Sequence, residues 1–217
     1  MKTLYGITLG LAISAVAVSA TTGTAFAAKK SQAHMGHVSK SWNDTPGKAG
    51  LLPTAVEEAK IAAFHAAAAA KKSDNLKWMQ KHARHVINAV DPSVEAKGPG
   101  KGYGVLKAAA GAAKHIGIAA KQGDASDNVK KHAVHVGASA QNTVDRAKSI
   151  IATAQKILAA TTAKAAAPLV KQMAMVAGQL QTGFDANGDG KIGWQKGEGG
   201  LGVATKHMGI MFKGEGM

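Results

Sequence analysis

Apolar residues recur every three or four positions over most of the chain after residue 50, and this spacing predicts amphipathic α-helices. The first predicted helix runs from Pro53 to about Lys72. The second is capped by Ser73 or Asp74 and stops before Pro92. The expected core positions are Val56, Ala59, Ala63, Ala66 and Ala70 on the first helix, and Leu76, Met79, Ala83, Val86 and Val90 on the second.

A second pair of helices repeats this pattern after the glycine-rich loop at 96–104. Gly123 ends the first helix of the pair and Asp127 caps the next one, which keeps its period as far as Thr161 and Thr162. The expected core positions are Leu106, Ala109, Ala113, Ile116 and Ala120, and then Val129, Ala133, Val136 and Ala140.

The two pairs carry the same histidine pattern at one offset. KHARHV at 81–86 matches KHAVHV at 131–136 (132 − 82 = 50), and His65 matches His115 at the same distance (115 − 65 = 50). A repeat of this kind indicates a duplicated helical hairpin. Neither hairpin buries its apolar side alone, so the sequence predicts an all-α fold with a four-helix up-down bundle over residues 51–165.

The flanking segments differ in character. Residues 1–27 have a basic start, an apolar stretch and a small-residue cleavage site at Ala25-Phe26-Ala27, which predicts a signal peptide and a periplasmic or secreted protein. Residues 28–50 lack helical or strand periodicity and are expected to form a flexible leader, although they contain His34-Met35-Gly36-His37, a weak candidate for a soft cation. Residues 166–217 are expected to form a separate helix-loop-helix, with Pro168 preceding its first helix.

Charge and cysteine content narrow the chemistry. The chain has 27 Lys and Arg against 13 Asp and Glu, a net charge of +14, and no cysteine. Thiolate metal sites and disulfides are therefore excluded. Export and the scarcity of aromatic residues argue against nucleic acid, and the lysines fit a solvated face or one that meets anionic envelope polymers. No further stretch is apolar enough to span a membrane after the signal peptide is cleaved.

The repeated histidines predict transition-metal sites. The midpoint of His65 and His82 falls in the predicted turn, so the two residues lie at the same height of an antiparallel hairpin, and His85 follows one turn along. The equivalent set in the second hairpin is His115, His132 and His135. Three imidazoles suit copper, zinc or nickel. The alternative is that these histidines, which flank the core stripes, lie in surface grooves and bind nothing.

The segment DANGDGKIGWQK at 185–196 suggests a calcium loop. Asp185, Asn187 and Asp189 alternate before a glycine turn, and Lys191 follows at a position that ligates through its backbone carbonyl. Lysine stands where a bidentate glutamate belongs, and Glu198 is expected to supply the missing carboxylate. A helix from Leu201 to Phe212 is predicted to follow, with His207 and Met211 on one face as packing residues. The alternative is an Asx-rich turn without an ion.

Two resemblances follow from these motifs. The loop at 185–198 resembles an EF-hand, which implies bound calcium. The alanine-rich, histidine-repeating segment at about 54–145 resembles the small periplasmic metal-binding proteins of nitrifying bacteria, which implies a four-helix bundle that takes up copper and other divalent metals. We therefore expect an exported, non-enzymatic metal-binding protein with calcium at the loop and copper or zinc at the histidines. The alternative is a non-catalytic envelope scaffold or adhesion-type module with structural calcium alone.

Overall fold

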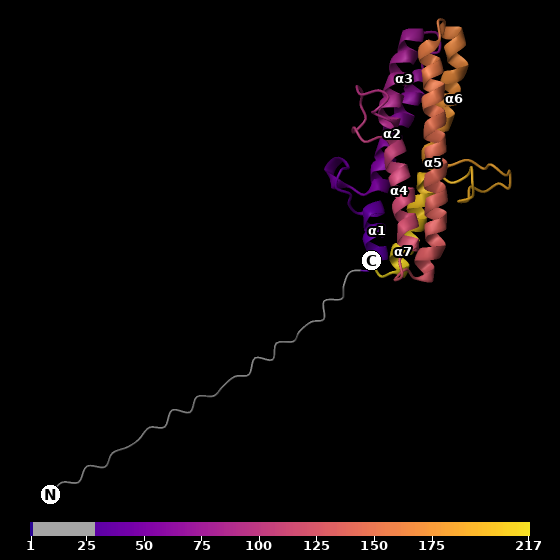
Figure 1. The fold of residues 1–217 in the computed structure, drawn as a ribbon. Coiled ribbons are helices and arrows are strands. Elements are labelled where there is room, and N and C mark those ends of the chain that lie inside the picture. Colours follow the sequence, from indigo (N-terminus) through magenta and orange to yellow (C-terminus); the bar gives the residue numbers. More distant parts are fainter. Residues whose placement is uncertain (2–28) are drawn as a thin grey trace.

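The computed structural model describes residues 1 and 29–217, and this part of the chain is all-helical, with seven α-helices and no strand (Figure 1). The predicted all-α class is confirmed. The predicted signal segment lies, apart from Met1, outside the described residues. No helix in the described part is long and apolar enough to cross a membrane. The helices are α1 Lys30–Ser39, α2 Leu51–Ala70, α3 Leu76–Val90, α4 Val105–Ala120, α5 Asp127–Ala159, α6 Ala163–Thr182 and α7 Leu201–Gly214.

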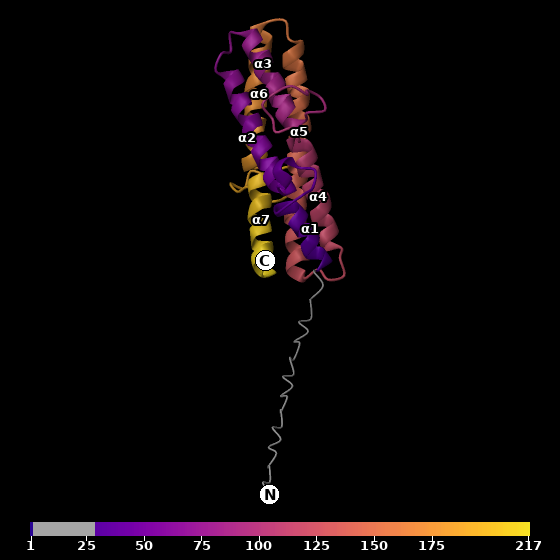
Figure 2. The same cartoon turned by 90° about the vertical axis from the view of Figure 1, so that its left-hand side faces the viewer.

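The helix α5 organises the molecule, because its 33 residues give it a length of about 50 Å at 1.5 Å per residue. Figures 1 and 2 show α2, α3 and α6 in one half of an elongated bundle and α1, α4 and α7 in the other, with α5 running through both halves. The predicted up-down bundle of four helices is not confirmed, because α6 packs on α2 and α5, α7 packs on α5, and α1 packs on α4.

The core is built largely from alanine, which allows the helices to approach closely. The predicted core positions of α3 and α5 are buried, with Met79, Val86 and Val136 fully so, except for Leu76, which is half-buried. On α2 the buried stripe is Ala55, Ala59, Ala62, Ala66 and Ala69. The predicted stripe of this helix was therefore partly wrong: Val56 and Ala63 are half-buried and Ala70 is exposed. Alanine on every face of this helix hides the direction of the core.

The expected flexible leader is instead ordered around α1. The Asp124 carboxylate, from the turn between α4 and α5, accepts hydrogen bonds from the backbone N–H groups of Lys30 and Ser31 and so caps the helix from another part of the chain. Met35 and Val38 on the inner side of α1 are fully buried. The leader prediction was wrong because these stabilising groups lie outside the segment.

The C-terminal part also differs from the prediction. Pro168 lies inside α6, whose first turn is capped by the Thr162 hydroxyl accepting from Ala165 N–H at 3.2 Å. An EF-hand helix pair is not confirmed. Residues 183–200 form an extended loop, and the buried Arg146 guanidinium of α5 donates to the carbonyl oxygens of Gly197, Glu198 and Gly199 at its base.

Candidate metal centres

The first predicted triad is present. His65 on α2 and His82 on α3 face each other with their Nδ1 atoms 2.9 Å apart, and the Nδ1 atom of His85 lies 3.3 Å from that of His65. The antiparallel α2–α3 hairpin brings the rings to the same height, as the spacing about the turn indicates. His82 is buried, with 7% of its surface exposed, and the other two are half-buried.

The second predicted triad does not form, and its members belong to two separate groups. His115 on α4 meets His34 and His37 of α1, at Nδ1–Nδ1 distances of 3.0 and 3.4 Å. His132 and His135 on α5 meet His207 of α7, at 3.0 and 3.3 Å. The prediction that His115 shares a site with His132 and His135 was therefore wrong, as was the assignment of His207 to packing.

The three groups have one design and use all nine histidines of the chain. In each, a single histidine on one helix faces a His-x-x-His pair on another, at about 3.0 Å from the first member and 3.3 or 3.4 Å from the second. Within the described residues these are the groups of three or more histidine or carboxylate ligands whose ligand atoms all lie within 4.8 Å of one another.

A shared local sequence sets this geometry. Each pair is part of a His-x-x-His-Val motif in which the residue after the first histidine and the final valine are buried: Met35 and Val38, Ala83 and Val86, Ala133 and Val136. The single histidines likewise precede buried residues, namely Ala66, Ile116 and Met208. Each histidine therefore borders a core stripe and projects into the groove beside the next helix.

Sequence signals for the missed residues existed. The segment AHMGHV at 33–38 has the same His-x-x-His-Val pattern as the two copies in the hairpins. The segment KHMGI at 206–210 matches KHIGI at 114–118 in four of five positions. Comparing the motifs without requiring the 50-residue offset would have placed His34, His37 and His207 in the set.

Burial lowers the pKa values of eight of the nine histidines. Burial is the largest cause and lowers the pKa of His65 to about 4, with smaller contributions from His85 and His82. Burial likewise lowers the pKa of His207 to about 4, helped by His135 and His132. The pKa values of the following histidines are also lowered, with burial as the first cause: His37, His82, His85, His115, His132 and His135. Neutral imidazole is the form that binds a metal.

The Nδ1 contacts fit an ion better than they fit hydrogen bonds alone. A neutral imidazole carries one N–H, so the central histidine of a group cannot donate from Nδ1 to both neighbours. For metal–nitrogen bonds of about 2.0–2.1 Å, separations of 2.9 to 3.4 Å correspond to N–metal–N angles of about 90–110°. These angles are those of three nitrogen ligands that bind one side of a metal ion.

The candidate calcium ligands are arranged differently. The Asp185 carboxylate accepts from the N–H groups of Gly188 and Gly190 at 2.7 and 2.8 Å, and Asp189 accepts from Lys191 N–H at 2.8 Å. Asn187 Oδ1 accepts from Asp189 N–H at 2.9 Å. Glu198, 2% exposed, instead accepts from Gly193 N–H at 2.8 Å, and Asp185, Asp189 and Glu198 are not among the convergent groups of the described residues.

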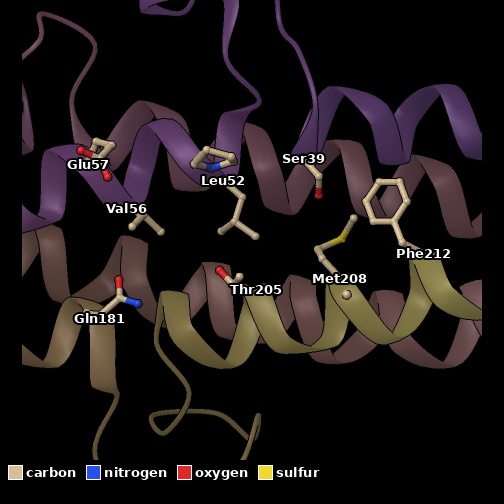
Figure 3. A pocket seen from close by; sticks show the side chains of 10 residues that line it. Ser39, Leu52, Val56, Glu57, Gln181, Thr205, Met208 and Phe212 are labelled. Atoms are coloured by element: carbon tan, nitrogen blue, oxygen red, sulfur yellow. The ribbon is translucent and has the colours of Figure 1, made fainter. Parts of the chain in front are cut away.

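An apolar groove is separate from these centres. It has a volume of about 470 Å³ and lies between α2 and α7, lined mainly by apolar side chains such as Leu52, Val56, Met208 and Phe212 (Figure 3). None of its lining residues is a histidine. It therefore contributes no metal ligand.

Comparison with known protein families, curated proteins and solved structures finds no match to this chain. The resemblances to an EF-hand and to the periplasmic metal-binding proteins are thus limited to the short motifs that suggested them. The class that the fold and the three groups define is a helical protein with three-histidine clusters able to hold metal ions.

Proposed function

We propose that this protein binds transition-metal ions, one at each three-histidine group, and so carries three ions per chain. The observation that supports the proposal is the threefold recurrence of one Nδ1 arrangement on three different helix pairs. Duplication accounts for the likeness of α3 and α5, but α1 and α7 lie outside the duplicated hairpins. Assembling the same cluster with segments outside the duplicated hairpins is expected if an ion selects it.

The type of ligand limits which metal ions these groups favour. Imidazole nitrogen suits copper, zinc and nickel, whereas calcium and magnesium require oxygen ligands. No carboxylate belongs to any of the three groups.

Elemental analysis with one variant per group tests the proposal. The purified protein, loaded with copper or zinc and dialysed, is expected to retain three ions. His65→Ala, His115→Ala and His207→Ala should each retain two, because each removes the histidine that both others face. Lys114→Ala and Lys206→Ala change exposed neighbours of two of these histidines and should retain three. Retention of fewer than three ions by the unmodified protein, or unchanged retention by the histidine variants, contradicts the proposal.

Two further parts of the function are also proposals. An exported location rests on the signal-like sequence of residues 1–27. Calcium at 185–198 rests on the spacing of Asp185, Asn187 and Asp189, with Lys191 contributing its carbonyl oxygen and Glu198 a carboxylate. An envelope scaffold that meets anionic polymers through its lysines is the alternative, and it predicts salt-sensitive binding to envelope material with no transition metal retained after dialysis.

A further inference from the structure

All three tryptophans of the chain lie against the three histidine groups, one at each. The Trp42 ring centroid lies 4.5 Å from that of His115 and 4.9 Å from that of His37. The Trp78 centroid lies 4.4 Å from that of His82. The Trp194 centroid lies 4.5 Å from that of His135, and the two rings are stacked with an interplanar angle of 23°.

The three tryptophans belong to different parts of the chain. Trp42 follows α1, Trp78 belongs to the first turn of α3, and Trp194 comes from the loop before α7. The residue equivalent to Trp78 in the second hairpin (78 + 50 = 128) is Asn128. Duplication therefore did not distribute the tryptophans, and a shared requirement of the three centres accounts for them better than common descent does.

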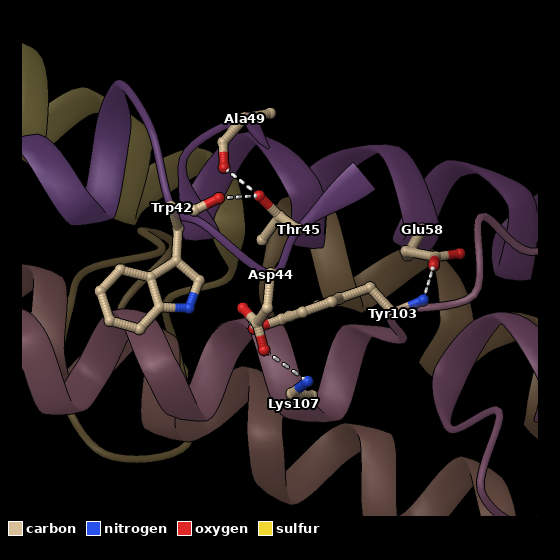
Figure 4. A network of polar contacts seen from close by, with 7 residues as sticks. All are labelled: Trp42, Asp44, Thr45, Ala49, Glu58, Tyr103 and Lys107. Atoms are coloured by element: carbon tan, nitrogen blue, oxygen red, sulfur yellow. Dashed lines mark hydrogen bonds and ion pairs between the residues drawn. The ribbon is translucent and has the colours of Figure 1, made fainter. Parts of the chain in front are cut away.

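Each indole is also held in position. The segment that carries Trp42 is closed by Thr45, whose hydroxyl donates to the Trp42 carbonyl oxygen at 2.8 Å, and is tied to α4 by the Asp44–Lys107 ion pair at 2.8 Å (Figure 4). The Trp78 Nε1–H donates to the Ala68 carbonyl oxygen of α2 at 2.8 Å. The loop of Trp194 is anchored by the hydrogen bonds of Arg146.

The charge around the centres disfavours highly charged ions. Each ligand set consists of three neutral imidazoles without a carboxylate. A lysine precedes at least one ligand in the sequence at every centre: Lys81 before His82, Lys114 before His115, Lys131 before His132 and Lys206 before His207. A divalent ion gains no anionic ligand in such a site and is repelled by these lysines more strongly than a monovalent one. The first centre has one acid nearby, Glu95, whose charge acts on His85.

The indole adds a preference of its own. Its ring face attracts a cation within about 6 Å of the ring centroid, and it offers no lone pair for a fourth metal–ligand bond. Three nitrogen donors satisfy monovalent copper, a soft ion of low coordination number. Divalent zinc and nickel need at least one more ligand, and the indole restricts the room for water or an anion beside the ring that it covers.

On the basis of the proposed function, we propose that the physiological ion at all three centres is Cu(I), held by three Nδ1 atoms and covered on one side by Trp42, Trp78 or Trp194. The tryptophans are then selectivity residues of the metal centres. The sites then select Cu(I) through the charge of their surroundings and the ring face of the indole rather than through a fourth metal ligand.

Metal competition under anaerobic conditions tests this inference. The full protein is titrated against a chromogenic Cu(I) chelator of known affinity, and in parallel against a Zn(II) indicator. Three Cu(I) ions are expected to bind. Trp42→Leu, Trp78→Leu and Trp194→Leu should each weaken Cu(I) at one centre by about 3- to 30-fold, the range of a cation–π contact, and change Zn(II) affinity by less than about twofold. The corresponding Trp→Phe variants retain a ring face and should recover part of the Cu(I) affinity.

The possible outcomes distinguish the assignment of Cu(I) from metal binding itself. Equal losses of Cu(I) and Zn(II) in the leucine variants, without recovery by phenylalanine, would show that the indoles only support the fold. Three bound Zn(II) ions with no Cu(I) uptake would overturn the choice of ion while leaving metal binding intact. Failure of the unmodified protein to retain any transition metal would overturn both proposals. Circular dichroism of each variant identifies loss of the helical fold, and the Trp→Phe series then decides the result.

Discussion

Replacing His115 by alanine should remove one metal ion and with it one of the attachments of α1 to α4. His115 Nδ1 is the atom that both His34 and His37 of α1 face. The remaining polar attachment of the start of this helix is the cap formed by Asp124 on Lys30 and Ser31. The α1 helix has 10 residues, too few for an isolated helix to be stable in water. An ion that joins α1 to α4 therefore contributes directly to keeping this helix folded.

The size of the effect follows from linkage between binding and unfolding. At a free metal concentration of 100 times the dissociation constant, one occupied site adds about 2.7 kcal/mol to the free energy of unfolding. Three independent sites add about 8 kcal/mol. For a chain of this size, 1 kcal/mol corresponds to about 2–4 °C in Tm, so each site raises the Tm by about 5–11 °C. The metal-induced rise should be about one third smaller in His115→Ala.

Calorimetric scans of the metal-free and metal-saturated proteins measure this rise, and hydrogen exchange of residues 30–39 shows whether α1 is released. Lys114→Ala is the matched control, because it changes the exposed neighbour and leaves the ligands in place. A full metal-induced rise in His115→Ala would refute the assignment of an ion to this group. Loss of the whole rise would refute the independence of the three centres.

Three further predictions address the apo protein, a buried carboxylate and the acidic loop. The folded-state pKa of His65 and of His207 is about 4, below the ordinary 6.5, so the unfolded chain binds more protons between these two pH values. The free energy of unfolding of the metal-free protein should therefore be fully retained above pH 6.5 and fall from there towards pH 4, by at most about 1.4 kcal/mol per pH unit for each histidine. Urea titrations across this range measure the fall, and a flat profile would contradict the neutral state of these two rings. Glu58→Ala should lower the free energy of unfolding in urea by about 3–5 kcal/mol, because the buried carboxylate accepts from three backbone N–H groups of the 101–104 loop at 3.0 Å each. The control Lys60→Ala, at an exposed neighbouring position, should lower it by less than about 0.5 kcal/mol. Equal losses would contradict this role of Glu58. Calorimetric titration should detect weak calcium binding that Asp185→Ala abolishes and His65→Ala leaves unchanged, and the absence of heat in the unmodified protein would identify the loop as an Asx turn.

The first hairpin shows how far sequence reasoning reaches. The recurrence of apolar residues every three or four positions predicted α3 and α5 and most of their buried positions. The spacing about the turn predicted that His65 lies beside His82 and His85. These inferences involve residues of one contiguous hairpin, in which a short turn fixes which helices are antiparallel neighbours. Local spacing is then sufficient to determine contact.

The second hairpin shows where this reasoning stops. The turn between α2 and α3 comprises residues 71–75, whereas that between α4 and α5 comprises 121–126, with caps at Asn75 and Ser126 (126 − 75 = 51). The spacing of the histidines across the turn is nevertheless the same in both hairpins (82 − 65 = 17 and 132 − 115 = 17), so local spacing does not distinguish them. The flanks of α4 and α5 instead meet α1 and α7, which are 81 and 75 residues away in the closest histidine contacts. Contacts between such distant segments depend on the packing of the whole bundle.

The position of the histidines beside the core, rather than within it, suits reversible metal binding. A ligand in the centre of the stripe would be closed off by alanine packing on all sides, and ion entry would require the helices to separate. At the flank, eight of the nine rings are half-buried and one is buried, and this partial burial lowers the pKa values of His65 and His207 without sealing the groove. Each group also joins two helices, so an ion can bind between preformed backbones with small side-chain movements. The placement of the histidines beside the core stripes therefore explains how three such sites can coexist with a closely packed alanine core.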